Sequence, residues 1–306
     1  MESSKSLMKK RQTEPLYKAD NKNIYYSDFV SSLREAGIKN GDTIFVHSRI
    51  SAFGKLCTFD KNFLLQALSD ALKECVGKDG TIIMPTFTYS FDKNEAFDMD
   101  NTKSTVGVLT EFFRKEKDVS RTIHPNHSAA IWGKNKNNLL KISKDTFDEN
   151  SILGKLHKLN GKIVFLGAPF QSCTFIHYIE QMHKVPYRYM RKFRGKIIAH
   201  GKEYEDEISF YNKYNFFFSL FSKLEKYLLN KGLMREVKIG NGDILMVESD
   251  ILFKEGHDLL DKDIYFFLKN EPIIFKLFNV LIYPFLRYMP WLVGILDKAY
   301  SRFMHG

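Results

Sequence analysis

Two hydrophobic periods alternate along most of the chain. In some segments apolar residues recur every three to four positions, as Phe29, Leu33 and Ala36 do, and this spacing predicts a helix with one buried face. Between them lie short, continuous apolar runs bounded by turn residues, which are typical of buried strands. The expected helices are 27–37, 60–76 and 106–116, and the expected strands are 43–47, 81–84, 128–132 and 162–166. Strands that alternate with helices favour an α/β fold with a mostly parallel central sheet covered by helices.

The pattern changes after residue 195. Lys196 to Tyr204 has a His-Gly turn between two extended runs and predicts a hairpin, and 216–231 is apolar at helical spacing. Together these segments predict a small hairpin and helical lobe, or a lid. Residues 271–303 are apolar with interspersed cations, but their charge-free stretches are about half the roughly 20 residues that a membrane-spanning helix needs. We expect an apolar helical extension that lies in the membrane interface, or that packs on the core or on a second subunit of a homo-oligomer.

The segment from Gly161 to Glu180 carries the clearest chemical pattern. Its apolar run ends at Gly167 and Pro169, and the helix start that follows holds His177 and Glu180 three residues apart. Residues at this spacing share one helical face, and ligands of open α/β sheets bind beyond the carboxyl ends of the strands. A histidine oriented by a carboxylate is equipped to act as a general base near neutral pH. The same spacing occurs in ordinary helix pairs, so these two residues alone leave both interpretations open.

Composition and charge restrict the class of protein. A chain of 306 residues that is 44% hydrophobic can bury a large core, and three cysteines without paired spacing indicate a reducing, cytoplasmic compartment. Cys173, four residues before His177, is interpreted as a small apolar filler, with a thiol nucleophile as the alternative. The net charge of +10 is densest in one run, which is either a site for phosphate or a nucleotide diphosphate or a solvated face. The run consists of Arg188, Arg191, Lys192, Arg194 and Lys196.

Several kinds of site are disfavoured by the motifs that the sequence lacks. The chain has no phosphate-binding G-x-x-x-x-G-K-[ST] loop, no G-x-G-x-x-G dinucleotide fingerprint and no G-x-S-x-G nucleophile elbow. No nucleic-acid-binding motif accompanies the positive charge, so nucleic acid is not an expected partner. Its histidines, including His124, His127, His177 and His183, form no closed set of four ligands at a known spacing, so no metal is expected.

Blocks of strand ends, turns and helix starts follow one another in a characteristic order. They include Arg121-Thr-Ile-His-Pro-Asn-His-Ser128 and Ile239-Gly-Asn-Gly-Asp-Ile-Leu-Met-Val247, and the others are 41–51, 79–86, 105–114, 147–156 and 161–180. From about Tyr25 to about Leu268, the chain resembles the aminoglycoside 3-N-acetyltransferase family, also called the antibiotic N-acetyltransferase family. The resemblance implies an acyl-CoA-dependent N-acyltransferase domain over 23–268. A flexible tail at 1–22 precedes this domain, and the apolar, basic extension at 269–306 follows it.

The resemblance also implies the roles of particular residues. Acetyl-CoA is the expected co-substrate, and an acetyl or other short acyl group passes directly to a primary amine. His177 is the expected base, Glu180 holds its tautomer, and His124 donates a hydrogen bond near the active site. Arg49 stands where the family usually has a second serine, so it either brings a charge to a phosphate or alters the pocket. The residues expected to contact coenzyme A are His47, Ser48, Arg49, Ser51, Thr86, Ser104, Thr105, Val106 and Gly107.

Charge guides the choice of acceptor. The segment 87–103 is short, and Lys93 and Lys103 offset its acidic residues, which suits a polycationic drug poorly. We therefore expect the amine of an amino sugar, including a nucleotide-linked one, in the synthesis of a surface glycan or polysaccharide. Two alternatives stay open: an aminoglycoside 3-N-acetyltransferase that confers antibiotic resistance, and a catalytically dead scaffold of the same fold. The expected location is the cytoplasm, with peripheral contact to the inner face of the membrane through 271–303.

Overall fold

The central sheet has seven strands and is mixed. The computed structural model describes residues 13–58, 60–215 and 217–269. In this part of the chain the strand order is β12-β13-β9-β3-β5-β8-β7. Only β3 with β9 and β3 with β5 pair in parallel, and the other neighbours are antiparallel. The strands are β3 (Thr43–Ser48), β5 (Thr81–Pro85), β7 (Ser120–Arg121), β8 (Ala129–Gly133), β9 (Lys162–Leu166), β12 (Arg235–Ile239) and β13 (Gly242–Glu248).

The α/β class is confirmed, but the expectation of a mostly parallel sheet is wrong. Short connections account for two of the antiparallel pairs, β12 with β13 and β7 with β8, because parallel neighbours need a crossover of a dozen or more residues whereas antiparallel neighbours do not. β12 returns into β13 through the two residues Gly240 and Asn241, and Gly240 has φ +57, which suits a tight hairpin turn. β7 likewise returns into β8 through the short loop 122–128. Apolar runs alone could not distinguish these pairings.

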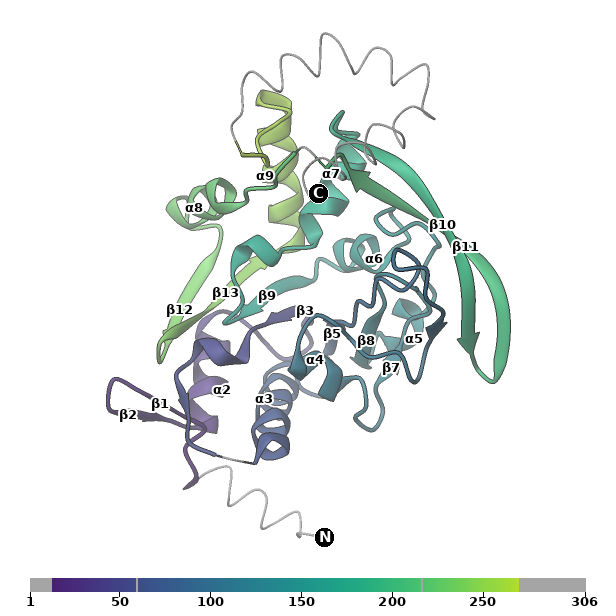
Figure 1. Cartoon of the computed structure of the whole chain (residues 1–306). Helices are drawn as coiled ribbons and strands as arrows, with labels where there is room; N and C mark the ends of the chain where they lie inside the picture. The colour runs from purple at the N-terminus through teal and green to yellow at the C-terminus, as the bar shows by residue number, and fades with distance from the viewer. Residues whose placement is uncertain (1–12, 59, 216, 270–306) are drawn as a thin grey trace, which may run out of the picture.

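Helices cover both faces of the sheet (Figure 1). On one face, α2 and α3 bury residues such as Phe29 and Leu68 in a core with Ile44 of β3. On the other face, α6, α7 and α9 share a core with the neighbouring residue of β3, Phe45. Alternate residues of one strand thus serve opposite cores, which makes β3 continuously apolar. The helices are α2 (Tyr26–Glu35), α3 (Lys61–Val76), α4 (Val108–Phe113), α5 (Lys136–Leu139), α6 (Ile152–Lys158), α7 (Phe175–His183), α8 (Ser222–Asn230) and α9 (Ser249–Lys262).

A long hairpin forms one part of the expected hairpin and helical lobe, whereas the helical part, α8, packs into the main core through Leu224 and Leu228. β10 (Arg188–Ala199) and β11 (Lys202–Lys213) pair along their whole length, well beyond the 196–204 that the sequence predicted. The short strand β6 (Phe97–Asp98) pairs in parallel with β10, and Phe97 joins a small separate core between them. In Figure 1 the hairpin runs along one side of the molecule, from α7 past β8 and α5. The lobe is therefore tied to α7 at the base of β10.

The N-terminal segment is folded where the sequence predicted a tail, and the expected C-terminal extension lies mostly outside the described residues. Within the expected tail at 1–22, β1 (Tyr17–Ala19) pairs with β2 (Lys22–Ile24) and with β4 (Lys55–Leu56), and Tyr17 is fully buried. The residues from Tyr17 onward are therefore part of the folded domain. The expected extension at 269–306 is outside the described residues except for its first. Across the described residues, no helix is both long and apolar enough to cross a membrane.

A glycine permits the turn between β9 and the helix that follows. Gly167 has φ +68, a left-handed conformation that disfavours other residues. A Cβ there would lie 2.8 Å from the backbone oxygen of Arg49 and 2.9 Å from Cβ of Ala52. This close approach brings the segment after β9 against the segment after β3.

We predict that Gly167→Ala destabilises the fold more than Gly201→Ala. Gly201, in the β10–β11 turn, has φ +71, but a Cβ there would have no atom within 4 Å. The left-handed conformation destabilises both variants by roughly 1–2 kcal/mol. Only in Gly167→Ala does a steric clash add about 1–3 kcal/mol of destabilisation. Urea denaturation should show the larger loss of unfolding free energy for Gly167→Ala. Equal losses would contradict the close approach at Gly167.

Candidate active site

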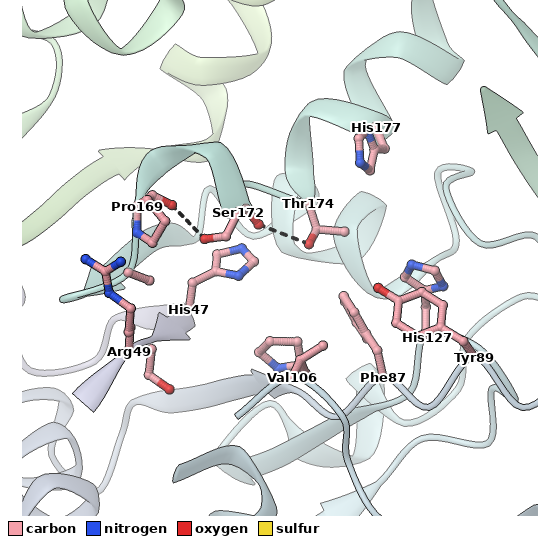
Figure 2. A pocket seen from close by; sticks show the side chains of 13 residues that line it. His47, Arg49, Phe87, Tyr89, Val106, His127, Pro169, Ser172, Thr174 and His177 are labelled. Carbon is pink, nitrogen blue, oxygen red and sulfur yellow. Dashed lines mark hydrogen bonds between the residues drawn. The ribbon is translucent and has the colours of Figure 1, made fainter. Parts of the chain in front are cut away.

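The carboxyl ends of β3, β5 and β9 border a cavity of about 440 Å³. β3 and β9 end side by side, with Ser48 paired to Leu166, and β5 ends nearby at Pro85. The turns beyond these strands supply the walls, and α7 presents His177 from one side (Figure 2). The cavity is lined by His47, Ser48, Arg49, Pro85, Phe87, Tyr89, Val106, His127, Ala168, Pro169, Ser172, Thr174 and His177.

His177 and Glu180 pair on α7 as their spacing predicts. Nδ1 of His177 lies 2.8 Å from Oε2 of Glu180. The Glu180 side chain is fully buried, whereas 26% of the His177 side chain is exposed. The carboxylate therefore lies behind the imidazole, and the imidazole faces the cavity.

Two further residues complete this network, and sequence reasoning did not identify them as part of it. Arg188, at the start of β10, has Nη2 2.7 Å from Glu180 Oε2, and its Nη1 donates to the backbone oxygen of Tyr211. The hydroxyl of Tyr187 donates to Glu180 Oε1 at 3.0 Å. The Arg188 side chain is 3% exposed. In the sequence Arg188 is simply the first member of a basic run, and nothing in that run distinguishes a buried arginine from an exposed one.

This ion pair determines which nitrogen of His177 carries hydrogen. Nδ1 lies 2.8 Å from both Glu180 Oε2 and Arg188 Nη2. A guanidinium can only donate, and an ionised carboxylate can only accept. Both short contacts of Glu180 Oε2 are hydrogen bonds when Nδ1–H and Arg188 Nη2 each donate to it, whereas Arg188 Nε has no hydrogen-bond partner among the described residues. That arrangement leaves the lone pair on Nε2, the nitrogen that a base at the cavity needs.

Burial and charge keep the histidine neutral and the glutamate ionised. Burial, followed by the positive charge of Arg188, lowers the pKa of His177 below its usual 6.5, against a smaller raising effect of Glu180. Burial would raise the pKa of Glu180, but Arg188, His177 and Tyr187 together hold that pKa below its usual value. A neutral imidazole backed by a carboxylate can accept a proton at physiological pH.

Eight of the nine residues expected to contact coenzyme A line one of three adjoining cavities. A second cavity, of about 230 Å³, shares Ser48 and Arg49 with the first. A third, of about 560 Å³, shares Gly107 and Val108 with the second. The Ser48 hydroxyl is buried without a hydrogen-bond partner among the described residues. The eight residues are His47, Ser48, Arg49, Ser51, Ser104, Thr105, Val106 and Gly107.

Thr86 lies elsewhere than the sequence suggested. It is fully buried, its hydroxyl lies 3.0 Å from that of Ser128, and Arg121 Nε lies 3.2 Å from the same hydroxyl. Arg121 also donates to the backbone oxygens of Met99 and Thr102. Thr86 therefore anchors a loop and does not line the cavities, so its expected contact with coenzyme A is corrected.

His124 also lies behind the cavity wall. Its Nδ1 accepts a hydrogen bond from the backbone N–H of His127 at 2.9 Å, and its Nε2 lies 3.2 Å from the Thr146 hydroxyl. With both nitrogens engaged and only 2% of the residue exposed, His124 shapes the loop that places His127. The residue that reaches the cavity from this loop is His127, which the sequence analysis considered only as a metal ligand.

The basic run is an ion-paired face and not an open phosphate site. Lys192 and Arg194 pair with Glu207 across the hairpin, and Lys196 pairs with Glu203. Arg191 lies 3.9 Å from Asp92, and Arg188 is buried against Glu180. The cross-strand register of β10 and β11 places these opposite charges side by side. The diphosphate interpretation of this run is therefore abandoned.

Two of the candidate chemistries find no support. Cys173 is buried outside the cavity lining, and burial raises the pKa of its thiol to about 12, so it lacks the thiolate character of a nucleophile. In the part of the chain that the structure describes, no three or more His, Cys, Asp or Glu residues are grouped to hold a metal ion.

The structure places a histidine backed by a buried carboxylate in a cavity that adjoins two others, an arrangement that suits a group-transfer enzyme. A family model for aminoglycoside 3-N-acetyltransferase matches residues 45–261. The aminoglycoside N(3')-acetyltransferase-like protein YokD of Bacillus subtilis is 30% identical over 69% of this chain and 83% of its own length. The chain belongs to the aminoglycoside 3-N-acetyltransferase family.

A further relative and two solved structures of aminoglycoside acetyltransferases are also similar to this chain. Aminoglycoside N(3)-acetyltransferase IV of Salmonella sp is 25% identical, covering 79% of this chain and 89% of its own. The apoenzyme of AAC(3)-IVa has a TM-score of 0.69 at 22% identity, over 86% of this chain and 95% of its own. AAC-IIIb, solved as a binary complex with coenzyme A, has a TM-score of 0.67 at 22% identity, over 81% of this chain and 98% of its own. The protein is an N-acetyltransferase that uses acetyl-CoA as its co-substrate.

We predict opposite pH shifts for two variants of the network. Glu180 raises the pKa of His177 and Arg188 lowers it. In Glu180→Gln the acidic limb of the kcat/KM profile should therefore move to lower pH, and in Arg188→Met to higher pH. Glu180→Gln should also lose about 100-fold or more in kcat, because the tautomer is no longer fixed. Arg188→Lys, which keeps the charge, is the control. Shifts in the same direction for both variants would contradict the network.

Proposed function

We propose that this enzyme transfers the acetyl group of acetyl-CoA to an amine of an aminoglycoside, with His177 as the general base. The observation that carries the proposal is the His177–Glu180–Arg188 network at the inner end of three adjoining cavities. The acceptor class rests on relatives, because structures of an AAC(3)-IVa variant with a gentamicin and with apramycin, and of AAC-VIa with sisomicin, are similar to this chain. The comparisons therefore favour this acceptor over the amino sugar of surface glycan synthesis that charge alone suggested.

The chemical step moves one acetyl group and one proton. The free amine attacks the thioester carbonyl carbon and forms the C–N bond, while Nε2 of His177 takes a proton from the amine nitrogen. The C–S bond then breaks, and the coenzyme A sulfur receives the proton from the imidazolium. The products are the N-acetylated acceptor and free coenzyme A. General-base assistance of this kind contributes a factor of about 100 to 10,000.

The three cavities form a route of the right character for coenzyme A. At the inner end lie His177 and the buried Ser48 hydroxyl, where the thioester would sit. At the outer end, Lys61 and Lys103 line the third cavity, and neither pairs with an acidic side chain among the described residues. Free ammonium groups there suit the phosphates of the coenzyme. Arg49, between the two ends, donates from Nε to the backbone oxygen of Gly167 and supplies the one formal charge in the described wall of the first cavity.

We predict that His177→Ala retains coenzyme A binding and loses turnover by at least about 100-fold. The measurement is thiol release from acetyl-CoA with gentamicin or apramycin as acceptor, together with the rise in melting temperature that acetyl-CoA produces. His183→Ala is the matched control, because His183 lies on the same helix but outside the cavity lining. Full turnover by His177→Ala would remove His177 from the mechanism.

Lys103→Gln should raise the KM for acetyl-CoA by about tenfold, since one charge-assisted hydrogen bond is worth about 1.5 kcal/mol. The acceptor KM should stay unchanged, and the effect should shrink at high salt. Lys134→Gln serves as the control, because Lys134 is exposed and pairs with Asp79 away from the cavities. Equal effects of the two substitutions would argue against this route for the coenzyme.

A further inference from the structure

His127 is a buried histidine with unused hydrogen-bonding capacity. It is 6% exposed, it lines the same cavity as His177, and its Nδ1 has no hydrogen-bond partner among the described residues. Its Nε2 also has no hydrogen-bond partner among the described residues, and unlike Nδ1 this atom is not fully buried. Such a nitrogen needs a partner from a ligand or solvent, because an unpaired buried polar group costs about 1–3 kcal/mol.

The surroundings of His127 keep it neutral. Its ring contacts those of Phe87, Tyr89, Phe147 and Phe210 at centroid distances of 4.4 to 5.4 Å. Burial lowers the pKa of His127 well below its usual value, and the nearby His124 and His177 lower it further. A buried acceptor without a partner is tolerated better than a buried donor. The hydrogen therefore belongs on Nε2, and His127 presents a neutral N–H donor to the cavity.

The position of His127 indicates that it contacts the acceptor and not coenzyme A. Arg49, which lines the second cavity of the coenzyme route as well, lies at one end of the site in Figure 2. His127 and Tyr89 lie at the opposite end, and the Tyr89 hydroxyl points inward. His177 lies above the space between the two ends. An acceptor that meets the thioester at His177 must therefore lie against His127 and Tyr89.

This end of the site is uncharged. None of the 13 described residues that line the cavity is a carboxylate. Glu180 lies 2.8 Å from His177, but it is fully buried and paired with Arg188. Asp92 contributes, after burial, to raising the pKa of Tyr89, and its half-exposed side chain lies 3.9 Å from Arg191. The ring that enters the cavity meets aromatic faces and a neutral donor.

We propose that His127 is a specificity-determining residue, whose N–H binds a hydroxyl oxygen of the acceptor that enters the cavity. This inference rests on the proposed function. A hydroxyl offers the lone pair that the N–H requires, whereas an ammonium at the same position has none and would enter a site without a carboxylate. The enzyme therefore selects acceptors with a hydroxyl, over those with a second amine, at the position that meets His127.

The test measures binding to the protein saturated with coenzyme A, by calorimetry. The probes are kanamycin A and kanamycin B, which carry a hydroxyl and an amine, respectively, at one ring carbon. The wild-type protein should bind kanamycin A about tenfold more tightly, the equivalent of 1.4 kcal/mol. His127→Phe, which keeps the ring contacts and removes the donor, should abolish this preference, and His127→Gln should retain part of it. The dissociation constant of coenzyme A should not change.

The outcomes separate this inference from the proposed function. A preference for kanamycin B, or a preference that survives in His127→Phe, overturns the role of His127 even when turnover is high. Absence of turnover on any aminoglycoside overturns the proposed function, and the binding comparison still decides the role of His127. Where His127→Phe fails to fold, His127→Leu, which also lacks a donor, takes its place.

Discussion

The site depends on the buried ion pair between Glu180 and Arg188. Both side chains are almost completely removed from solvent, at 0% and 3% exposure, so each charge offsets much of the cost of burying the other. Glu180 comes from α7 and Arg188 from the first residue of β10, so the pair joins the sheet-covering helix to the hairpin lobe. Because Glu180 also holds Nδ1 of His177, the orientation of this imidazole depends on the position of the lobe.

The mixed sheet explains why the cavity forms where it does. Among the described strands of this sheet, β3, β5 and β9 are the adjacent strands that run in one direction, so their carboxyl ends lie side by side at one edge, and their antiparallel neighbours β13 and β8 flank them. The segments after these strands leave the sheet at Arg49, Thr86 and Gly167. The strand topology thus confines the site to a narrow central region between two hydrophobic cores.

The sequence predicted what is local and missed what depends on the third dimension. The strand at 162–166, the turn at Gly167 and the pairing of His177 with Glu180 follow from spacing within a few residues, and the structure agrees with each. The antiparallel pairing of β8 with β5 and of β13 with β9 joins strands that are far apart in the sequence, and apolar runs do not encode the direction of such a pairing. The family resemblance placed His124 near the site, but only coordinates show that its two nitrogens are engaged and that His127 faces the cavity.

The opposing effects of Glu180 and Arg188 suit a base that must also release its proton. A carboxylate alone would raise the pKa of His177 and strengthen its hold on the proton taken from the amine. Arg188 offsets that charge, and with burial it brings the pKa of His177 below 6.5. A thiol has an ordinary pKa of about 8.5, so an imidazolium of lower pKa gives its proton to the departing coenzyme A thiolate favourably. In the proposed mechanism, burial and the same arginine keep His177 neutral before the reaction and make it an adequate acid when the C–S bond breaks.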